Sequence, residues 1–353
     1  MNMEYTKFTG YIGTYTKGES KGIYSFVLDT EAGRISEIQL AGTLDNPTYL
    51  TISKDQRFLY SVMKKDTKGG VAAYKIDPNS TKLSLINTQL LEGAPPCHVN
   101  TDSQQRYLFS TNYHRGTVES YLINQHTGEI SEPSSVVQHE GNGPDERQEK
   151  AHTHYAGMTP DEKYLVVVEL GSDKLLTYNV KEDGTLTEVS RLDIRPGSGP
   201  RHLTFHPLNK NIAYIMTEFS SEIIVLSYHE ENGSFTVLET HKTIPNDFVE
   251  NNQGSAIHTS SDGKFVYVGN RGHNSIAIFK SNSETGRLEF VSTISTEGDW
   301  PRDFVLDPTE KYLIVSNQNS SNLVLFSRDS ETGTLKLLQK DIVVPDPVCV
   351  KFL

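Results

Sequence analysis

Ionisable side chains stand at matching places in a phrase that this 353-residue sequence repeats. A histidine or a carboxylate can take a proton from water, and a guanidinium can bind an anionic group or stabilise an oxyanion. If these side chains meet, they indicate acid–base chemistry on a small anionic molecule. Taken singly, each also fits a salt bridge between neighbouring segments. The set consists of His154, Arg201, Arg271, Arg302, Glu169 and Glu218.

These residues occupy two places in the repeated phrase. The phrase begins with a small residue or proline and a short apolar segment, followed by a polar turn and a second apolar segment, as in 200–205 and 213–218. A third segment ending on an aromatic residue and a fourth segment after a Gly-containing turn complete it. One group of polar residues opens the first segment, and the other stands at the end of the second. Asn112 and Gln318 are further polar residues at the second place.

The phrase recurs seven times at intervals of roughly 50 residues, which is the period expected of propeller blades. We therefore predict one all-β domain over residues 1–353, a seven-bladed β-propeller with four antiparallel strands per blade. The first copy lacks its first strand, and the chain ends with a spare one over 347–353. Pairing this C-terminal strand with the N-terminal blade would close the ring and leave no open edge.

Propeller topology gives the two places a spatial meaning. The first strand of a blade lies nearest the channel, and the second strand runs antiparallel beside it. The start of the first strand and the end of the second therefore lie on the same face of the ring. We expect the polar residues of blades 4 to 7 to converge at one mouth of the channel.

The segment 138–151, before blade 4, is longer than its counterparts and should fold over this mouth. It leads into His152 and His154, which alternation along an extended segment places on one side. Two such histidines would suit a metal ion. No third ligand with suitable spacing follows, so we predict no metal site.

Charge and composition narrow the function classes. A net charge of −12 disfavours nucleic-acid binding, and no apolar run is long enough for a membrane span. Residues 1–5 show no features of a signal peptide, and Cys97 and Cys349 are too few for a disulfide framework. We expect a cytoplasmic protein without a nucleic-acid or membrane partner. The oligomeric state, monomer or dimer, stays open.

Three parts of the sequence resemble the bacterial propeller-type 6-phosphogluconolactonase family. They are Gly-Pro-Arg-His-Leu-Thr-Phe-His-Pro at 199–207 with Glu218 following, His152-x-His154 ahead of 159–161, and Trp-Pro-Arg-Asp-Phe at 300–304 ahead of 317–318. The resemblance spans the whole chain in the same order. It implies a hydrolase without a cofactor that opens a small anionic sugar lactone, most directly 6-phosphogluconolactone of the pentose phosphate pathway. The fold family also contains fungal carboxy-cis,cis-muconate lactonizing enzymes, which form the lactone bond instead.

Carried across by position, the resemblance assigns roles to individual residues. His154 or Glu218 would activate the attacking water, and we favour His154 as the base with Glu218 as its partner. Arg201 would then face the reacting carboxyl group while Arg271 and Arg302 hold the phosphate, although the arginine roles can be exchanged. Two alternatives remain open, a lactonizing or isomerizing enzyme and a non-enzymatic scaffold that binds protein. The further expected substrate-binding residues are Arg147, His152, Glu169, Asn112 and Gln318.

Overall fold

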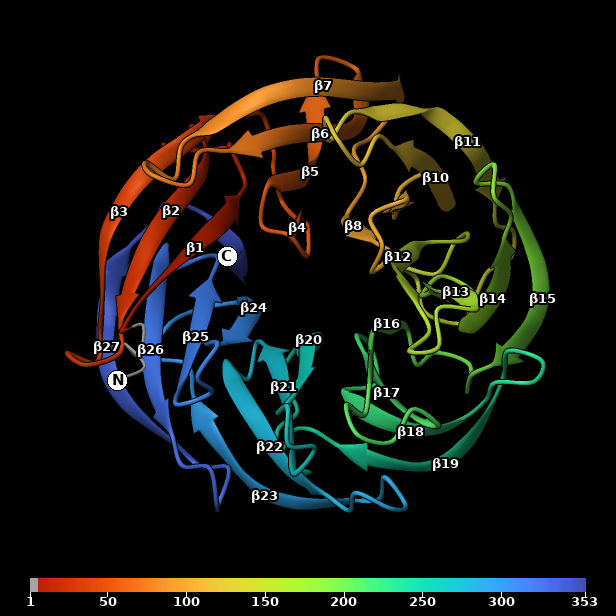
Figure 1. The fold of residues 1–353 in the computed structure, drawn as a ribbon. Helices are drawn as coiled ribbons and strands as arrows, with labels where there is room; N and C mark the ends of the chain where they lie inside the picture. Colours follow the sequence, from red (N-terminus) through yellow and green to blue (C-terminus); the bar gives the residue numbers. More distant parts are fainter. Residues whose placement is uncertain (1–5) are drawn as a thin grey trace.

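The computed structural model describes residues 6–353 and shows seven four-stranded antiparallel sheets arranged in a ring around a central channel (Figure 1). Every regular element in this range is a β-strand. The predicted all-β, seven-bladed propeller is confirmed. Residues 1–5, the basis for expecting no signal peptide, lie outside the described part of the chain.

Within a blade the strands follow one another outward from the channel, except in blade 1, whose innermost strand comes from the C-terminus. Blade 1 contains β28 (Pro347–Phe352), β1 (Lys7–Thr14), β2 (Gly22–Asp29) and β3 (Arg34–Thr43). Blade 2 contains β4 (Leu50–Ile52), β5 (Phe58–Lys65), β6 (Lys68–Ile76) and β7 (Leu83–Glu92). Blade 3 contains β8 (His98–Thr101), β9 (Tyr107–Asn112), β10 (Thr117–Ile123) and β11 (Ile130–Gln138). Blade 4 contains β12 (Thr153–Met158), β13 (Tyr164–Glu169), β14 (Lys174–Val180) and β15 (Leu186–Asp193).

The remaining blades keep the same order. Blade 5 contains β16 (Pro200–Phe205), β17 (Ile212–Thr217), β18 (Glu222–His229) and β19 (Ser234–Lys242). Blade 6 contains β20 (Gln253–Thr259), β21 (Phe265–Arg271), β22 (Ser275–Ser281) and β23 (Leu288–Ser295). Blade 7 contains β24 (Pro301–Leu306), β25 (Tyr312–Asn317), β26 (Asn322–Arg328) and β27 (Leu335–Val343).

The two ends of the chain close the ring as predicted. Strand β28 pairs antiparallel with β1, with Gly10 opposite Phe352 and Ile12 opposite Val350. The C-terminus accordingly lies beside β1 in Figure 1. This pairing gives blade 1 its innermost strand and leaves no blade without a neighbour.

The apolar core lies between the blades rather than at the centre of the ring. One cluster joins Phe26 and Leu28 of blade 1 to Ile314 and Leu325 of blade 7, and six others lie between the remaining pairs of neighbours. Strands covered on both faces need continuous apolar runs. Each fully buried side chain of this kind contributes about 1.5–3 kcal/mol. Packing between blades therefore holds the inner strands rigid around the channel.

A β-bulge recurs near the start of the innermost strand. The ladder skips one residue between Thr153 and Tyr155, between Pro200 and His202, and between Pro301 and Asp303. A bulge leaves its extra residue unpaired and re-aims its side chain. The skipped residues are His154, Arg201 and Arg302.

The residue immediately after the second strand also has a constant place, which we call the post-strand position. Its backbone N–H donates to the carbonyl just before the first strand, as from Glu218 to Gly199 (2.6 Å) and from Gln318 to Trp300 (3.0 Å). Blades 1 and 4 make the same bond from Tyr15 and Leu170. The bulge and the post-strand position together bring side chains to one mouth of the channel.

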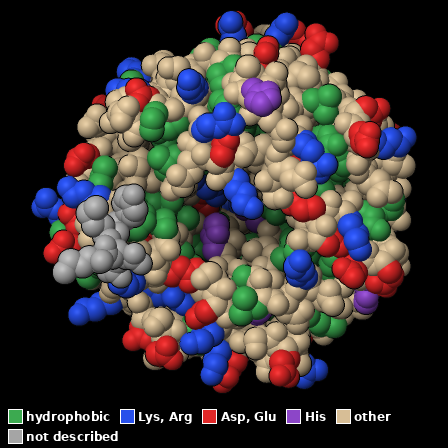
Figure 2. Space-filling model, viewed as in Figure 1, with side chains coloured by type: hydrophobic (Ala, Val, Ile, Leu, Met, Phe, Trp, Pro, Cys, Tyr) green, Lys and Arg blue, Asp and Glu red, His purple; other side chains and the backbone are tan. Residues whose placement is uncertain are grey.

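The surface carries both signs of charge, and the centre of the ring is hollowed in the view of Figure 2, where Lys or Arg and His side chains lie inside the channel. Within residues 6–353 there is no helix of the length and apolarity that a membrane crossing needs.

Candidate active site

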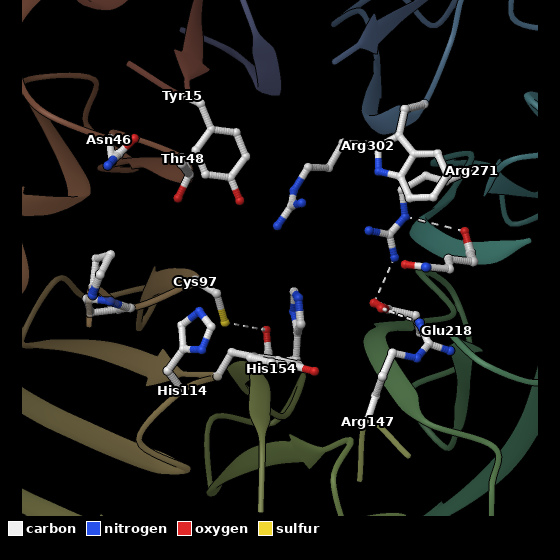
Figure 3. A pocket seen from close by; sticks show the side chains of 15 residues that line it. Tyr15, Asn46, Thr48, Cys97, His114, Arg147, His154, Glu218, Arg271 and Arg302 are labelled. Atoms are coloured by element: carbon white, nitrogen blue, oxygen red, sulfur yellow. Dashed lines mark hydrogen bonds and ion pairs between the residues drawn. The ribbon is translucent and has the colours of Figure 1, made fainter. Parts of the chain in front are cut away.

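The mouth formed by the bulges and post-strand positions holds a cavity of about 400 Å³ (Figure 3). This volume lies within the range of small-ligand sites. Of the ten residues expected at the site, five line the cavity: Arg147, His154, Glu218, Arg271 and Arg302. The structure thus brings together residues from blades 4 to 7 that lie far apart in the sequence.

Glu218 lies at the centre of an ion-pair cluster. Its Oε2 accepts from Arg271 Nη2 at 2.7 Å and from Arg201 Nε at 3.1 Å, and its Oε1 lies 3.8 Å from Arg147 Nη1. Burial alone would raise the pKa of Glu218, but the charges of Arg271 and Arg201 outweigh burial and hold that pKa below its ordinary value. Glu218 is therefore a carboxylate at neutral pH.

The amide of Gln253 completes this cluster. In the amide orientation that satisfies both neighbours, it donates to Glu218 Oε1 at 3.2 Å and accepts from Arg147 Nη1 at 3.0 Å. Arg147 also bonds Asp145 (3.2 Å) and stacks over the Phe219 ring, 3.9 Å from its centroid. The cluster is thus fixed from several directions.

Arg201 lies behind Glu218 and does not line the cavity. It is 2% exposed, and its Nη1 donates to the Ser255 carbonyl at 2.6 Å. Burial, and then the charge of Arg271, lowers the pKa of Arg201 to about 9, so it stays a cation at neutral pH. Its guanidinium orients the carboxylate of Glu218.

Arg271 belongs to the same cluster but also reaches the cavity. Its Nη2 donates to the Gly254 carbonyl at 2.8 Å as well as to Glu218, and its Nε donates to the Gln253 carbonyl at 3.4 Å. Among residues 6–353 its Nη1 has no acceptor.

Arg302 differs from the other arginines because it has no carboxylate or carbonyl partner anywhere in the described chain. Its guanidinium lies 5.4 Å from the centroid of the Tyr15 ring and points into the cavity toward His154 (Figure 3). A half-buried cation without an internal partner can receive an anionic group of a ligand.

His154 is 4% exposed, and its Nδ1 is buried without a hydrogen-bond partner. Burial, followed by the charges of Arg201, Arg302 and Arg271, holds its pKa well below the ordinary value. The imidazole is therefore neutral at pH 7. The expected contact between His154 and Glu218 is not formed, because the oxygens of Glu218 are bonded by the arginines instead.

Residues 9–352 match the family described as lactonase, 7-bladed β-propeller. The chain belongs to this lactonase family. It is 54% identical over 348 residues to the 6-phosphogluconolactonase of Bacillus subtilis strain 168, covering 99% of both chains. This confirms the resemblance recognised in the sequence.

Solved structures agree with this membership. A protein from Lactobacillus plantarum is 44% identical with a TM-score of 0.94, covering 98% of this chain and 99% of its own. The periplasmic gluconolactonase of Pseudomonas aeruginosa is 32% identical with a TM-score of 0.93, again covering 98% and 99%. This lactonase-family chain therefore has relatives named for both a phosphorylated and an unphosphorylated lactone.

Four expected substrate-binding residues of this lactonase lie outside the cavity lining. His152 stacks on Tyr113 and bonds its carbonyl through Nδ1 at 2.6 Å. Glu169 accepts from the backbone of Gly171 and Ser172, both at 2.7 Å. Asn112 donates to the Ala94 carbonyl at 2.7 Å. Gln318 occupies the post-strand position of blade 7, where its Oε1 is buried without a partner.

The different outcomes for these residues have a common cause. Glu169 and Asn112 are the last residues of β13 and β9, whereas Glu218 follows β17 by one residue. Because side chains alternate along an extended chain, a shift of one residue changes the direction of a side chain. The repeat alone does not separate the strand end from the next residue, and here Glu218 reaches the cavity whereas Glu169 and Asn112 do not.

The segment 138–151 contributes to the cavity as expected, through Arg147. Gln148 is completely buried and donates to the Leu170 carbonyl at 2.8 Å, and its own carbonyl accepts from Gly143 at 2.9 Å. The bond to Leu170 anchors the segment to blade 4, and the bond from Gly143 holds the segment's own turn. Among residues 6–353 no group of three His, Cys, Asp or Glu side chains is arranged to hold a metal ion.

Several lining residues were missed in the sequence. Tyr15 holds the post-strand position of blade 1, and Tyr113 follows β9, so the rule that found Glu218 could have found both. Gln253 is the first residue of β20, two residues before Ser255, where the repeated phrase predicts that the first strand of blade 6 begins. His114 and Trp300 reach the cavity from loops; Trp300 stands in the motif at 300–304 that carries the resemblance, whereas none of the motifs that carry it contains His114.

Proposed function

We propose that this protein hydrolyses the ester bond of a sugar lactone, most directly 6-phosphogluconolactone, in the cavity at the channel mouth. The observation that carries the proposal is a buried imidazole, His154, whose Nδ1 has no hydrogen-bond partner in the described chain, beside Arg302, a guanidinium without an internal partner. Membership of the lactonase family and the 54% identical 6-phosphogluconolactonase support it.

The proposed reaction begins with water bound between His154 and the lactone carbonyl carbon. His154 takes a proton from the water as its oxygen adds to that carbon, and the carbonyl oxygen becomes an oxyanion. When the oxyanion collapses, the bond from carbon to the ring oxygen breaks and the proton passes from His154 to that oxygen. The products are a free hydroxyl group and a carboxylic acid, which then ionises.

The arginines take different parts in this scheme. Arg271 Nη1 stabilises the oxyanion, a contribution of a few kcal/mol in related sites. Arg302 binds the phosphate, with a charge-assisted hydrogen bond of about 1.5–3 kcal/mol. Arg201 acts as a positioning residue through Glu218, which replaces the direct substrate contact first expected for it. Glu218 holds Arg271 in place rather than serving as a base.

The test measures hydrolysis of 6-phosphogluconolactone, generated enzymatically in the assay and corrected for spontaneous opening. His154→Ala should lose about 10²–10⁴-fold in kcat, the usual contribution of a general base. His126→Ala, on the exposed turn between β10 and β11, is the matched control and should keep full activity. Equal rates for His154→Ala and His126→Ala would remove His154 from the reaction.

A second candidate substrate is the unphosphorylated gluconolactone, favoured by the 32% identical relative from Pseudomonas aeruginosa. The unpaired Arg302 supports the phosphorylated substrate, because a neutral sugar would leave its charge without a partner. Comparing kcat/KM for the two lactones separates these candidates. Comparing sugar lactones with muconates tests the lactonizing alternative in the same way.

We also propose that the protein works in the cytoplasm. The free Cys97 and Cys349 support this location, and a phosphorylated sugar as the proposed substrate is consistent with it. Fractionation of cells that produce the full chain would test it.

A further inference from the structure

We propose that the dianionic group of the substrate is a working part of the catalytic site. Bound at Arg302, it supplies the negative charge that allows His154 to take the proton from water. The proposal rests on the lactone hydrolysis proposed above and concerns how that reaction is restricted to charged substrates.

The first observation is an asymmetry between blades 5 and 7. Arg201 and Arg302 are the bulged residues of β16 and β24. The post-strand position beside Arg201 is Glu218, and its Oε2 lies 3.1 Å from Arg201 Nε. In blade 7 the same position is Gln318, which is neutral. The blade geometry repeats, but Arg302 lacks the carboxylate that its counterpart has.

The second observation is the balance of charge around the cavity. The four guanidiniums of Arg147, Arg201, Arg271 and Arg302 are met by two carboxylates, Asp145 and Glu218. Two positive charges therefore remain in a cavity of about 400 Å³. A phosphate monoester carries close to −2 at neutral pH and matches this excess.

The third observation is the environment of His154. A histidine base in hydrolases is commonly oriented by a carboxylate on its other ring nitrogen, which also stabilises the imidazolium. Here Nδ1 of His154 has no partner within residues 6–353, and no carboxylate contacts the ring. The groups that face it are cations, neutral histidines, a thiol and a phenol, namely Arg201, Arg271, Arg302, His98, His202, Cys97 and Tyr113.

These observations together indicate what the ligand must bring. Positive charge around His154 opposes the imidazolium that forms when it takes a proton. A dianion at Arg302 offsets that charge, and an opposite charge within about 4–6 Å moves a pKa by about 1–3. His154 thereby becomes a stronger base only when an anionic substrate is present. With a neutral lactone bound, His154 would stay a weak base and hydrolysis would be slow.

The experiment supplies the lactone and the dianion as two separate molecules. The full-length protein hydrolyses unphosphorylated glucono-1,5-lactone with and without inorganic sulfate, with sodium chloride holding the ionic strength constant. Sulfate stays dianionic over the pH range of the assay and is a poor proton acceptor, so it does not open the lactone itself. We expect sulfate to raise kcat/KM saturably by about tenfold or more, and to move the acid limb of the pH profile upward.

Variants of blade 7 sharpen this test. Arg302→Ala should abolish the response to sulfate, whereas Arg287→Ala, an exposed arginine in the turn before β23, should keep it. Gln318→Glu puts a carboxylate at the post-strand position of blade 7, the position that Glu218 holds in blade 5. It should hydrolyse the unphosphorylated lactone faster than the parent without sulfate, and sulfate should then have little effect. Gln318→Met, which adds no charge, should still respond to sulfate.

Hydrolysis of 6-phosphogluconolactone by the parent is measured in the same series. If that lactone is hydrolysed rapidly while sulfate only inhibits opening of the neutral lactone, the activating role of the dianion is wrong and the proposed function stands. If neither lactone is hydrolysed faster than in the absence of protein, the proposed function itself is wrong.

Discussion

Blades 5 and 7 have the same backbone arrangement, but only blade 5 provides a carboxylate for its bulged arginine. Both carry a bulged arginine after a proline, and both close the neighbouring turn with the same backbone hydrogen bond. In blade 5 the arginine is buried in a closed ion-pair cluster with Glu218, whereas in blade 7 Arg302 points into the cavity without a counterion. The repeat gives the two arginines the same backbone position, and the blades differ in the residue at the post-strand position, Glu218 in blade 5 and Gln318 in blade 7.

The largest expected effect concerns blade 5. Glu218→Gln leaves Arg201 and Arg271 buried without a counterion, since both bond the same carboxylate oxygen. We expect the free energy of unfolding to fall by about 3–5 kcal/mol, measured by urea denaturation. Glu188→Gln is the control, because its pair with Arg191 is largely exposed and contributes about 0–1 kcal/mol. Equal losses in the two variants would show that the cluster is not electrostatically coupled.

The corresponding change in blade 7 should spare the fold. Arg302→Ala removes no internal ion pair, so we expect the free energy of unfolding to change by no more than about 0.5 kcal/mol. Its KM for 6-phosphogluconolactone should rise by about 10- to 100-fold, since a charge-assisted hydrogen bond contributes about 1.5–3 kcal/mol. Steady-state kinetics beside Arg287→Ala measures this. If Arg302→Ala were strongly destabilised, Arg302 would stabilise the fold as the Glu218 cluster of blade 5 does, and the proposed difference between the two blades would be wrong.

The smallest effect is a difference in pH dependence. The pKa of Glu218 is lowered in the folded protein, so the stability it contributes is present above its unfolded pKa of about 4.3 and is lost as the pH falls through the folded value. The parent should therefore be more stable than Glu218→Gln at neutral pH, and this difference in the free energy of unfolding should shrink below about pH 4.3. The loss is about 1.4 kcal/mol for each pH unit by which the folded pKa of Glu218 lies below the unfolded one. Urea denaturation from pH 7 downward tests this. A gap between the two proteins that stays constant would contradict it.

Much of the fold could be predicted because a propeller repeats local features. Apolar segments, turns and aromatic residues recur in each copy, and the spare strand at 347–353 pairs with the copy that lacks one. Open edges are unfavourable, so closure follows once seven units are counted. The same reasoning located the mouth where His154, Glu218 and Arg302 meet.

The candidate site was only partly predictable because the direction in which a side chain points depends on the exact register of its strand. Glu169 and Glu218 looked equivalent in the sequence, yet one ends its strand and bonds the backbone while the other follows its strand and binds arginines. Gln253 reaches the cavity from the start of β20, a place that the repeat did not mark as polar.

The sequence by itself determined the seven blades, their closure and the mouth at which polar residues gather, because these follow from strand periodicity and the pairing of neighbouring segments. Only the tertiary structure decided which side chains face a ligand. The bulges turn His154, Arg201 and Arg302 toward the channel mouth, and the contacts of Glu218 with Arg201 and Arg271 join two blades. Such contacts depend on a one-residue register that a repeated pattern of apolar and polar residues does not specify.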